Sequence, residues 1–438
     1  MELEFRDTSN MKIYKNLNPS DYATVLKRPA IDTTSLFGSI RNILSDIKIN
    51  GDAALKKYAL QFDKFDLTEF EVSENEFQIA ENQLDTHLKN AILLAKSNIE
   101  RFHQRQLSEP EIIETMTGIK CWRKSVGIEK VGLYIPGGTA PLFSTVLMLG
   151  IPAQLAGCKE VILCTPCKAD GVIHPAILFA AQSVGIFKVY KIGGVQAIGA
   201  MAYGTESIPQ VYKIFGPGNQ YVTAAKQVIN TEGVAIDMPA GPSEVMVIAD
   251  ASANPAFVAA DLLSQAEHGV DSQVVLLAYD NMIVKNILQQ IDNQLLTLPR
   301  ANIGRQALEN SVAIIVEDDA EAMAISNYYA PEHLILSTQN ADDLAEQVVN
   351  AGSVFIGHFS PESVGDYASG TNHTLPTNGY AKAYSGVSVD SFVKKITYQR
   401  LDTEGLKNIG AAVIAMAEAE QLDAHARAVS IRLEALKD

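Results

Sequence analysis

Basic residues are scarce in this chain: 35 Lys and Arg stand against 51 Asp and Glu, for a formal net charge of −16. A surface of that sign repels a phosphate backbone, so we expect no nucleic-acid partner. A cofactor that carries phosphate is not excluded, because the amino end of a helix can bind an anion through its backbone dipoles.

The sequence also lacks an apolar run long enough to cross a bilayer. It begins MELEFRDTSN, with acids where a signal peptide needs basic and then apolar residues. We therefore expect a cytoplasmic protein that has no membrane partner. No segment is of low complexity, and no short internal repeat is present.

Cysteine is rare, with four residues in the chain. Cys164 and Cys167 form a CxxC at the end of the predicted strand VILC, which could be a redox pair or half of a zinc ribbon. The ribbon is excluded because no second CxxC exists. A redox role stays open, but a strand-end turn in a reducing compartment is the favoured interpretation.

Strand and helix patterns alternate along most of the chain. The strand patterns KEVILCTP, FKVYKIGG and VYKIFGPG are each followed by a helical pattern, and a second alternation runs from EVMVIAD to SVFIGH. Such alternation predicts βαβ units and parallel sheets. We predict an α/β fold of two Rossmann-like parallel-sheet units, one inserted in the other, with small N-terminal and C-terminal helical extensions.

Length suggests several domains, since 438 residues are too many for one simple core. The N-terminal stretch predicts an arm or short helix, and one long helix is expected from about Thr403 to Leu436. The predicted division is an arm (1–25), a main α/β domain (26–133 and 244–384), an inserted Rossmann-like domain (134–243) and a C-terminal extension (385–438).

Three glycine-rich turns follow predicted strands, at Gly137-Gly138, Gly193-Gly194 and Gly216-Pro217-Gly218. They lie at the C-terminal edge of a parallel sheet, where ligands bind. None matches GxGxxG, because Tyr221 stands where the third glycine belongs. Either the glycines only allow tight turns, or a dinucleotide binds atypically. In the second case the candidate contacts are Tyr134, Gln196 and Asn219.

The stretch DLLSQAEHG (261–269) predicts a helix that carries a metal-ligand pair. Gln265 and His268 are three apart and therefore neighbours on one face. Taken alone, such a pair is usually surface or satisfied core. Asp366, His373 and His425 are further candidates, although a turn explains Asp366 and an exposed helix explains His425. Mixed imidazole and oxygen donors suit Zn²⁺, with Mn²⁺ or Co²⁺ as substitutes.

Acid–base chemistry is indicated by Glu332-His333, which opens a turn after a predicted helix. An adjacent pair of this kind offers a base and a group that activates water, and histidine titrates near neutrality. The dipeptide alone is a weak signal. His373 lies in a predicted loop, and loops on a rigid scaffold often carry function.

Several passages together resemble the histidinol dehydrogenase family, and the resemblance runs nearly from end to end. They are VGLYIPGG (131–138), KIFGPGN (213–219), IDMPAGPSE (236–244), DLLSQAEHG (261–269), APEHL (330–334) and SVGDYASGTNHTLPT (363–377). The family implies oxidation of L-histidinol to L-histidine through the aldehyde, with two NAD⁺ and one zinc ion per subunit. This would be the last step of histidine biosynthesis.

The resemblance also implies roles for residues. His333 would be the general base and Glu332 would activate water. The inserted domain would contact NAD⁺ through Tyr134, Gln196 and Asn219. The zinc ligands would be Gln265, His268, Asp366 and His425, and the substrate would be lined by Ser243, Gln265, His268, Glu332, His333, Asp366, His373, Glu420 and His425.

The C-terminal residues raise a geometric question. Glu420 and His425 are five apart, about 140° around a regular helix, so one unbroken helix cannot aim both at one point. The family implies that this tail reaches the site of a second subunit, which would make a homodimer with composite sites. The sequence leaves action within one chain or across two open.

Two other functions remain open. A metal-free aldehyde dehydrogenase would use Cys158, Cys164 or Cys167 as nucleophile. A metabolite sensor would keep the pocket without turnover, but a sensor does not need the base that Glu332-His333 provides.

Overall fold

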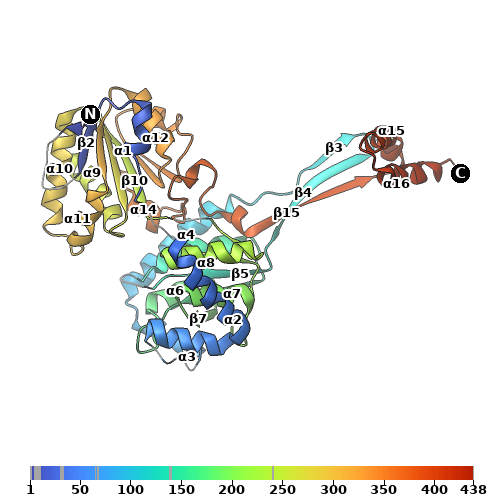
Figure 1. The fold of residues 1–438 in the computed structure, drawn as a ribbon, viewed down its shortest axis with the longest axis horizontal. Coiled ribbons are helices and arrows are strands. Elements are labelled where there is room, and N and C mark those ends of the chain that lie inside the picture. The colour runs from blue at the N-terminus through green and yellow to red at the C-terminus, as the bar shows by residue number, and fades with distance from the viewer. Residues whose placement is uncertain are drawn as a thin grey trace.

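The computed structural model describes residues 2–3, 11–29, 34–64, 66, 69–137, 141–238 and 241–437. Gly138, one of the predicted turn glycines, lies outside the described residues, as does part of the predicted arm. The molecule has two α/β units and a long arm that ends in a pair of helices (Figure 1). The predicted α/β class is confirmed.

The larger sheet has seven strands in the order β1-β2-β12-β11-β10-β13-β14, and all its pairs are parallel except β1 with β2. Every residue of Glu244–Ala249 is buried, as expected for a parallel strand covered on both faces. The strands are β1 (Glu2–Leu3), β2 (Lys12–Lys15), β10 (Glu244–Ala249), β11 (Gln273–Ala278), β12 (Val312–Ile315), β13 (His333–Ser337) and β14 (Ser353–Ile356).

Helices cover both faces of this sheet. Val245 and Val247 pack in one core, and Met246 and Ile248 pack in another, because successive side chains of a strand point to opposite faces. The first core includes α9 (Pro255–Ala266), α10 (Asn281–Leu295) and α11 (Ala301–Glu309). The second includes α1 (Tyr22–Val25), α12 (Asp319–Tyr329) and α13 (Ala341–Ala345).

The smaller sheet has five parallel strands in the order β7-β6-β5-β8-β9. The strands are β5 (Lys130–Tyr134), β6 (Glu160–Thr165), β7 (Lys188–Lys191), β8 (Lys213–Phe215) and β9 (Ala235–Ile236). One core contains α2 (Phe37–Tyr58), α7 (Gly194–Tyr203) and α8 (Gln220–Thr231). The other contains α3 (Glu74–Gln83), α4 (Thr86–Gln104), α5 (Phe143–Leu155) and α6 (Pro175–Ser183).

Two features differ from the predicted organisation. Helices α2 to α4 pack on the smaller sheet, whereas the predicted division groups 26–133 with 244–384. An amphipathic pattern identifies a buried face but not the sheet that covers it. The second difference is at the N-terminus, where Lys12–Lys15 is a strand paired with β12 instead of a helical extension.

A three-stranded antiparallel sheet forms the arm, in the order β15-β4-β3 (Figure 1). Its strands are β3 (Ile112–Met116), β4 (Ile119–Gly127) and β15 (Val393–Leu401). The predicted single C-terminal helix is wrong, because α15 (Thr403–Ala419) and α16 (Asp423–Glu434) are separate. Gln421 has a φ of 60°, a left-handed conformation that breaks the helix.

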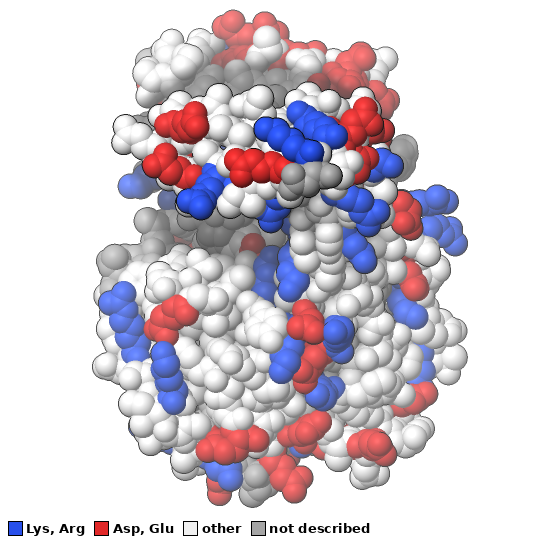
Figure 2. Space-filling model, turned by 90° about the vertical axis from the view of Figure 1, so that its right-hand side faces the viewer, with Lys and Arg blue, Asp and Glu red and all other residues white. Residues whose placement is uncertain are grey.

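Short helical turns complete the chain: Pro19–Asp21, Thr34–Leu36, Ala59–Asp63, Tyr380–Lys382 and Val389–Phe392, together with α14 (Glu362–Tyr367). None of the described helices has the length and apolar character that crossing a membrane needs. On the face drawn in Figure 2, side chains of both charge signs are interspersed over the described residues. The described part of this face therefore carries no single large patch of one charge sign.

Candidate active site

A cleft lies between the two parallel sheets. Its volume is about 710 Å³, and its walls include Asn219 at the start of α8, Ser243 just before β10 and His268 just after α9. The cleft therefore joins the C-terminal edge of the smaller sheet to the N-terminal edge of the larger one. Ligands usually lie beyond the C-terminal edge of a parallel sheet, so the contribution of the larger sheet comes from the unexpected edge.

Glu332 and His333 lie at this N-terminal edge, where β13 begins. Helix α12 gives way to the strand at Ala330, whose φ of 55° reverses the chain direction. Strand β13 pairs in parallel with β10, with His333 opposite Val245. This register brings the preceding residue, Glu244, against both side chains of the Glu332-His333 pair.

The backbone of Glu244 holds both groups. Its N–H donates to Glu332 Oε2 at 2.9 Å, and its carbonyl accepts from His333 Nδ1 at 3.1 Å. A carbonyl can only accept, so Nδ1 carries a proton, and Nε2 is the nitrogen that is left to gain or lose one. Nε2 is buried and lies 3.3 Å from Asp366 Oδ1, without an aligned hydrogen bond to a described residue. Any proton transfer by His333 would therefore take place at Nε2.

Carboxyl groups crowd this imidazole. Burial lowers the pKa of His333, but Glu332, Asp366 and Glu362 raise it, to about 10. Burial raises the pKa of Glu332 to about 8, against the lowering effect of His333. Burial also raises the pKa of Glu362, to about 7, and its Oε2 is buried without a partner among the described residues. The cluster is short of positive charge, a condition that suits a bound cation.

Donors for such a cation come from α9 and α14. Gln265 is fully buried in the last turn of α9. Both polar atoms of its amide find hydrogen-bond partners when the nitrogen donates to Glu362 Oε1 at 3.0 Å and the oxygen accepts from the Glu244 N–H at 3.2 Å. His268 follows the helix. Burial lowers the pKa of its ring, and the charge of Asp366 opposes that lowering. The C-terminal end of a helix carries partial negative charge, which also favours a cation.

These residues fit a divalent metal in the kind of donor they offer. Among the described residues no group of three His, Cys, Asp or Glu side chains could hold a metal. His268 and Asp366 supply two donors, and the Gln265 amide oxygen would be a third. Nitrogen and oxygen donors suit Zn²⁺, and a set this small leaves positions free for substrate or a further ligand, as catalytic sites require.

His373 lies beside the cluster with both ring nitrogens engaged. Its Nδ1 is 2.7 Å from the carbonyl oxygen of Asp366, and its Nε2 is 3.0 Å from the Thr145 hydroxyl. These contacts tie α14 to α5. In this arrangement the ring fixes Asp366 instead of facing open space.

Glu420 and His425 do not join the cluster of their own chain. Both are exposed, and they lie in the helix pair at the far end of the arm (Figure 1). The helix break at Gln421 separates them, which removes the geometric objection to both residues facing one point.

The three candidate cofactor contacts differ in position. Asn219 lines the cleft and also caps α8, because its side chain accepts from the N–H groups of Tyr221 and Val222. Tyr134 and Gln196 are almost fully buried. The Tyr134 hydroxyl accepts from the Gly194 N–H at 3.0 Å, and the Gln196 amide donates to Asp63 at 3.3 Å.

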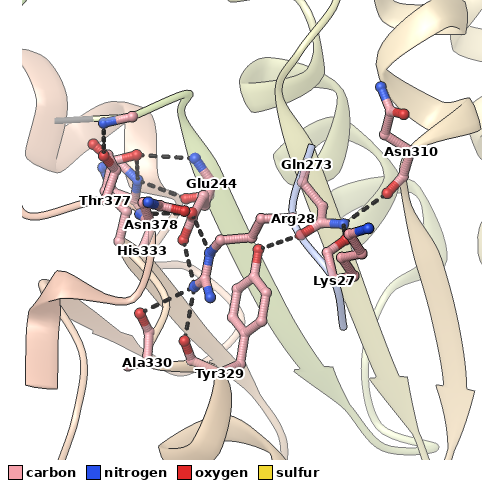
Figure 3. Close-up of polar contacts among 12 residues, drawn as sticks. Lys27, Arg28, Glu244, Gln273, Asn310, Tyr329, Ala330, His333, Thr377 and Asn378 are labelled. Carbon is pink, nitrogen blue, oxygen red and sulfur yellow. Dashed lines mark hydrogen bonds and ion pairs between the residues drawn. The ribbon is translucent and has the colours of Figure 1, made fainter. Parts of the chain in front are cut away.

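The sequence reasoning missed three residues near the Glu332-His333 pair: Glu362, Glu244 and Arg28. The first two lie in or beside passages that carry the family resemblance, so only their roles were missed. Arg28 gave no signal, because it precedes Pro29 in a segment without clear period. Figure 3 shows Arg28 reaching Glu244 and the end of α12.

Comparison with known proteins identifies the family of this chain. The family model described as histidinol dehydrogenase matches residues 26–433. The histidinol dehydrogenase of Bacteroides thetaiotaomicron is 59% identical over 98% of this chain and 100% of its own length. The chloroplastic enzyme of Arabidopsis thaliana is 51% identical over 97% of this chain and 92% of its own length.

A solved structure extends the likeness to the fold. The crystal structure of histidinol dehydrogenase from Elizabethkingia anophelis has a TM-score of 0.95 at 55% identity, and covers 98% of this chain and 99% of the other. Sequence and fold thus agree over almost the whole length. The chain therefore belongs to the histidinol dehydrogenase family and is a dehydrogenase.

Proposed function

We propose that this dehydrogenase oxidises L-histidinol to L-histidine through the aldehyde, with two NAD⁺ and one zinc ion per subunit, as the last step of histidine biosynthesis. The observation that carries the proposal is the clamp made by Glu244. It fixes a carboxyl group and a proton-accepting imidazole beside Asp366, at the edge of a cleft that Asn219 also lines.

His333 is the general base in this scheme, because a cation beside Asp366 would offset the carboxylate charge that raises the pKa of the ring. Its Nε2 takes the proton of the substrate hydroxyl, while a hydride leaves the carbon that bears this hydroxyl. A positioned base of this kind typically contributes roughly 10²–10⁴-fold. After the first oxidation Glu332 removes a proton from the water that adds to the aldehyde, and His333 serves again in the second oxidation.

Gln265, His268, Asp366 and a His425 from a second chain would hold the zinc ion, which would supply an anchor for the imidazole and amino nitrogens of the substrate. Fixing one carbon through two oxidations is a matter of proximity and orientation. Ser243, His373 and Glu420 would complete the substrate's surroundings. Ser243 Oγ lies 3.5 Å from His268 Nδ1, so its hydroxyl can orient that ring.

NAD⁺, when bound, would accept the hydride in each of the two oxidations. We assign its contacts to Tyr134, Gln196 and Asn219. In support, the turn before α8 needs glycine: Gly216 has a φ of 129°, and a Cβ there would lie 2.0 Å from the Tyr134 carbonyl oxygen. The start of α8 opens into the cleft and would favour the cofactor's phosphates.

We further propose a homodimer in which the arm of each chain carries Glu420 and His425 to the other's site. In one chain both residues are exposed at the tip of an arm that has little core of its own. Apolar side chains on the same tip, including Met416 and Ile431, are at least half exposed, as surfaces that pack on a partner are.

The alternative with a cysteine nucleophile is disfavoured by the thiols themselves. Burial raises the pKa of Cys158 to about 11, and it raises those of Cys164 and Cys167 as well. A thiol that stays protonated at neutral pH is a poor nucleophile.

The decisive test of the reaction is its stoichiometry. Purified enzyme given L-histidinol and excess NAD⁺ should form two NADH for each L-histidine. One NADH with released aldehyde would refute the four-electron reaction, and binding of histidinol without NADH would favour the sensor.

A further inference from the structure

Arg28 joins two elements that meet beneath the catalytic pair. Its Nε and Nη2 donate to the two carboxylate oxygens of Glu244, at 2.5 and 2.9 Å. Nη2 also donates to the Tyr329 carbonyl at 2.7 Å, and the guanidinium carbon lies 3.8 Å from the centre of the Tyr329 ring. Figure 3 shows this arginine between the start of β10 and the end of α12.

The Glu244 side chain depends on these contacts. It is 2% exposed, and its other neighbour is the Asn378 N–H, which donates to Oε1 at 2.7 Å. A buried carboxylate is stable only when it is paired. Loss of the guanidinium would therefore force this carboxylate to move, to take up a proton or to admit water.

Movement there would reach the catalytic groups directly. The same residue's N–H holds Glu332, and its carbonyl holds His333. The contact of Arg28 with the Tyr329 carbonyl also fixes the chain just before Glu332, because Tyr329 is the last residue of α12. Arg28 thus contacts both Glu244 and the end of α12, the two parts of the chain that set the relative position of Glu332 and His333.

We propose that Arg28 is a positioning residue for the oxidation: by holding the Glu244 carboxylate and the end of α12, it keeps Glu332 and His333 in their working geometry. The inference rests on the proposed function. Arg28 is 17% exposed and lines the cleft, but it acts through Glu244.

The test compares Arg28→Lys and Arg28→Ala with wild type. Lysine keeps the charge but loses the two-pronged contact and the stacking. We expect kcat to fall about 100-fold, the scale that a misplacement of about 1 Å produces, while the KM for histidinol and the bound zinc change little. Because Arg28 borders the open cleft, millimolar guanidinium should restore part of the kcat of Arg28→Ala.

Asn327→Ala is the matched control. Asn327 lies on α12, the helix whose end Arg28 contacts. Its side chain accepts from the N–H groups of Val349 and Asn350, but it has no contact with Glu244. This variant should lose stability, keep kcat and gain nothing from guanidinium.

The outcomes separate the two proposals. If wild type forms no NADH from histidinol, the proposed function fails and this inference fails with it. If wild type is active and Arg28→Lys keeps full kcat, only the inference fails. It also fails if kcat falls merely in proportion to folded protein, as measured by circular dichroism, or if Asn327→Ala falls equally.

Discussion

The backbone of Glu244 orients two neighbouring side chains, a task that other side chains usually perform in a catalytic site. One N–H and one carbonyl orient an acid and a base that are adjacent in the chain. Backbone groups are present at every position, so no residue type in the sequence indicates which residue orients the pair. The sequence could predict Glu332-His333 as the reactive pair, but the residue that aligns the pair appears only when β10 and β13 are in register.

Gly216 allows a prediction at the same scale. Gly216→Ala should raise the KM for NAD⁺ and lower stability, because the new Cβ would meet the Tyr134 carbonyl oxygen at 2.0 Å. Gly233→Ala is the control: its φ of 97° is also positive, but nothing lies within 4 Å. The control should cost only the strain, about 1–2 kcal/mol, in urea unfolding. Equal losses in both variants would contradict the steric account.

At the scale of elements, periodicity identified most strands and helices. The apolar runs at β10, β11 and β13 are strands as predicted, and the helix with Gln265 begins at Pro255 after its Asn254 cap. Periodicity did not identify β2, where Lys12 and Lys15 leave only two central side chains to bury. The break between α15 and α16 was also missed, since Gln421 is not a residue type that marks left-handed turns.

The same limit applies to the candidate site. Gln265, His268 and Asp366 could be proposed as metal ligands from the sequence, because the segments that contain them have distinctive residue patterns. The sequence did not show which sheet edge faces the cleft. Gly218 lies at a C-terminal edge and lines the cleft, whereas Glu332-His333 lies at the N-terminal edge where β13 begins. Which edge faces the cleft is decided by how the two units pack.

The turn before α8 depends on a buried ion pair. Lys226 contacts Asp237 and donates to the Gly216 carbonyl, while Asp237 accepts from the Gly216 N–H. Lys226→Met leaves a buried carboxylate unpaired, so it should cost about 3–5 kcal/mol, measured by urea unfolding.

Lys48→Met is the matched control for that pair. It breaks the exposed contact of Lys48 with Glu232 on the same unit, and exposed pairs contribute about 0–1 kcal/mol. A loss from Lys226→Met no larger than the control's would show that the buried pair does not support the turn.

At the scale of the whole molecule, the arm decides whether sites are composite. If His425 acts in a second chain, a mixed dimer of His333→Gln and His425→Ala has one intact site. Random reassociation of two inactive variants should then restore about a quarter of wild-type turnover, since half the dimers are mixed and each has one of two sites. Turnover that stays at zero after verified subunit exchange would rule out sites shared between chains.

The central claim is that Gln265, His268 and Asp366 hold a metal while His333 moves a proton. Bound zinc and NADH formation should be measured on the same samples of wild type, His268→Asn and His333→Gln. We predict that His268→Asn loses both zinc and turnover, whereas His333→Gln keeps its zinc and loses turnover by roughly 10²–10⁴-fold. Loss of zinc from His333→Gln, or full turnover in zinc-free wild type, would contradict the account.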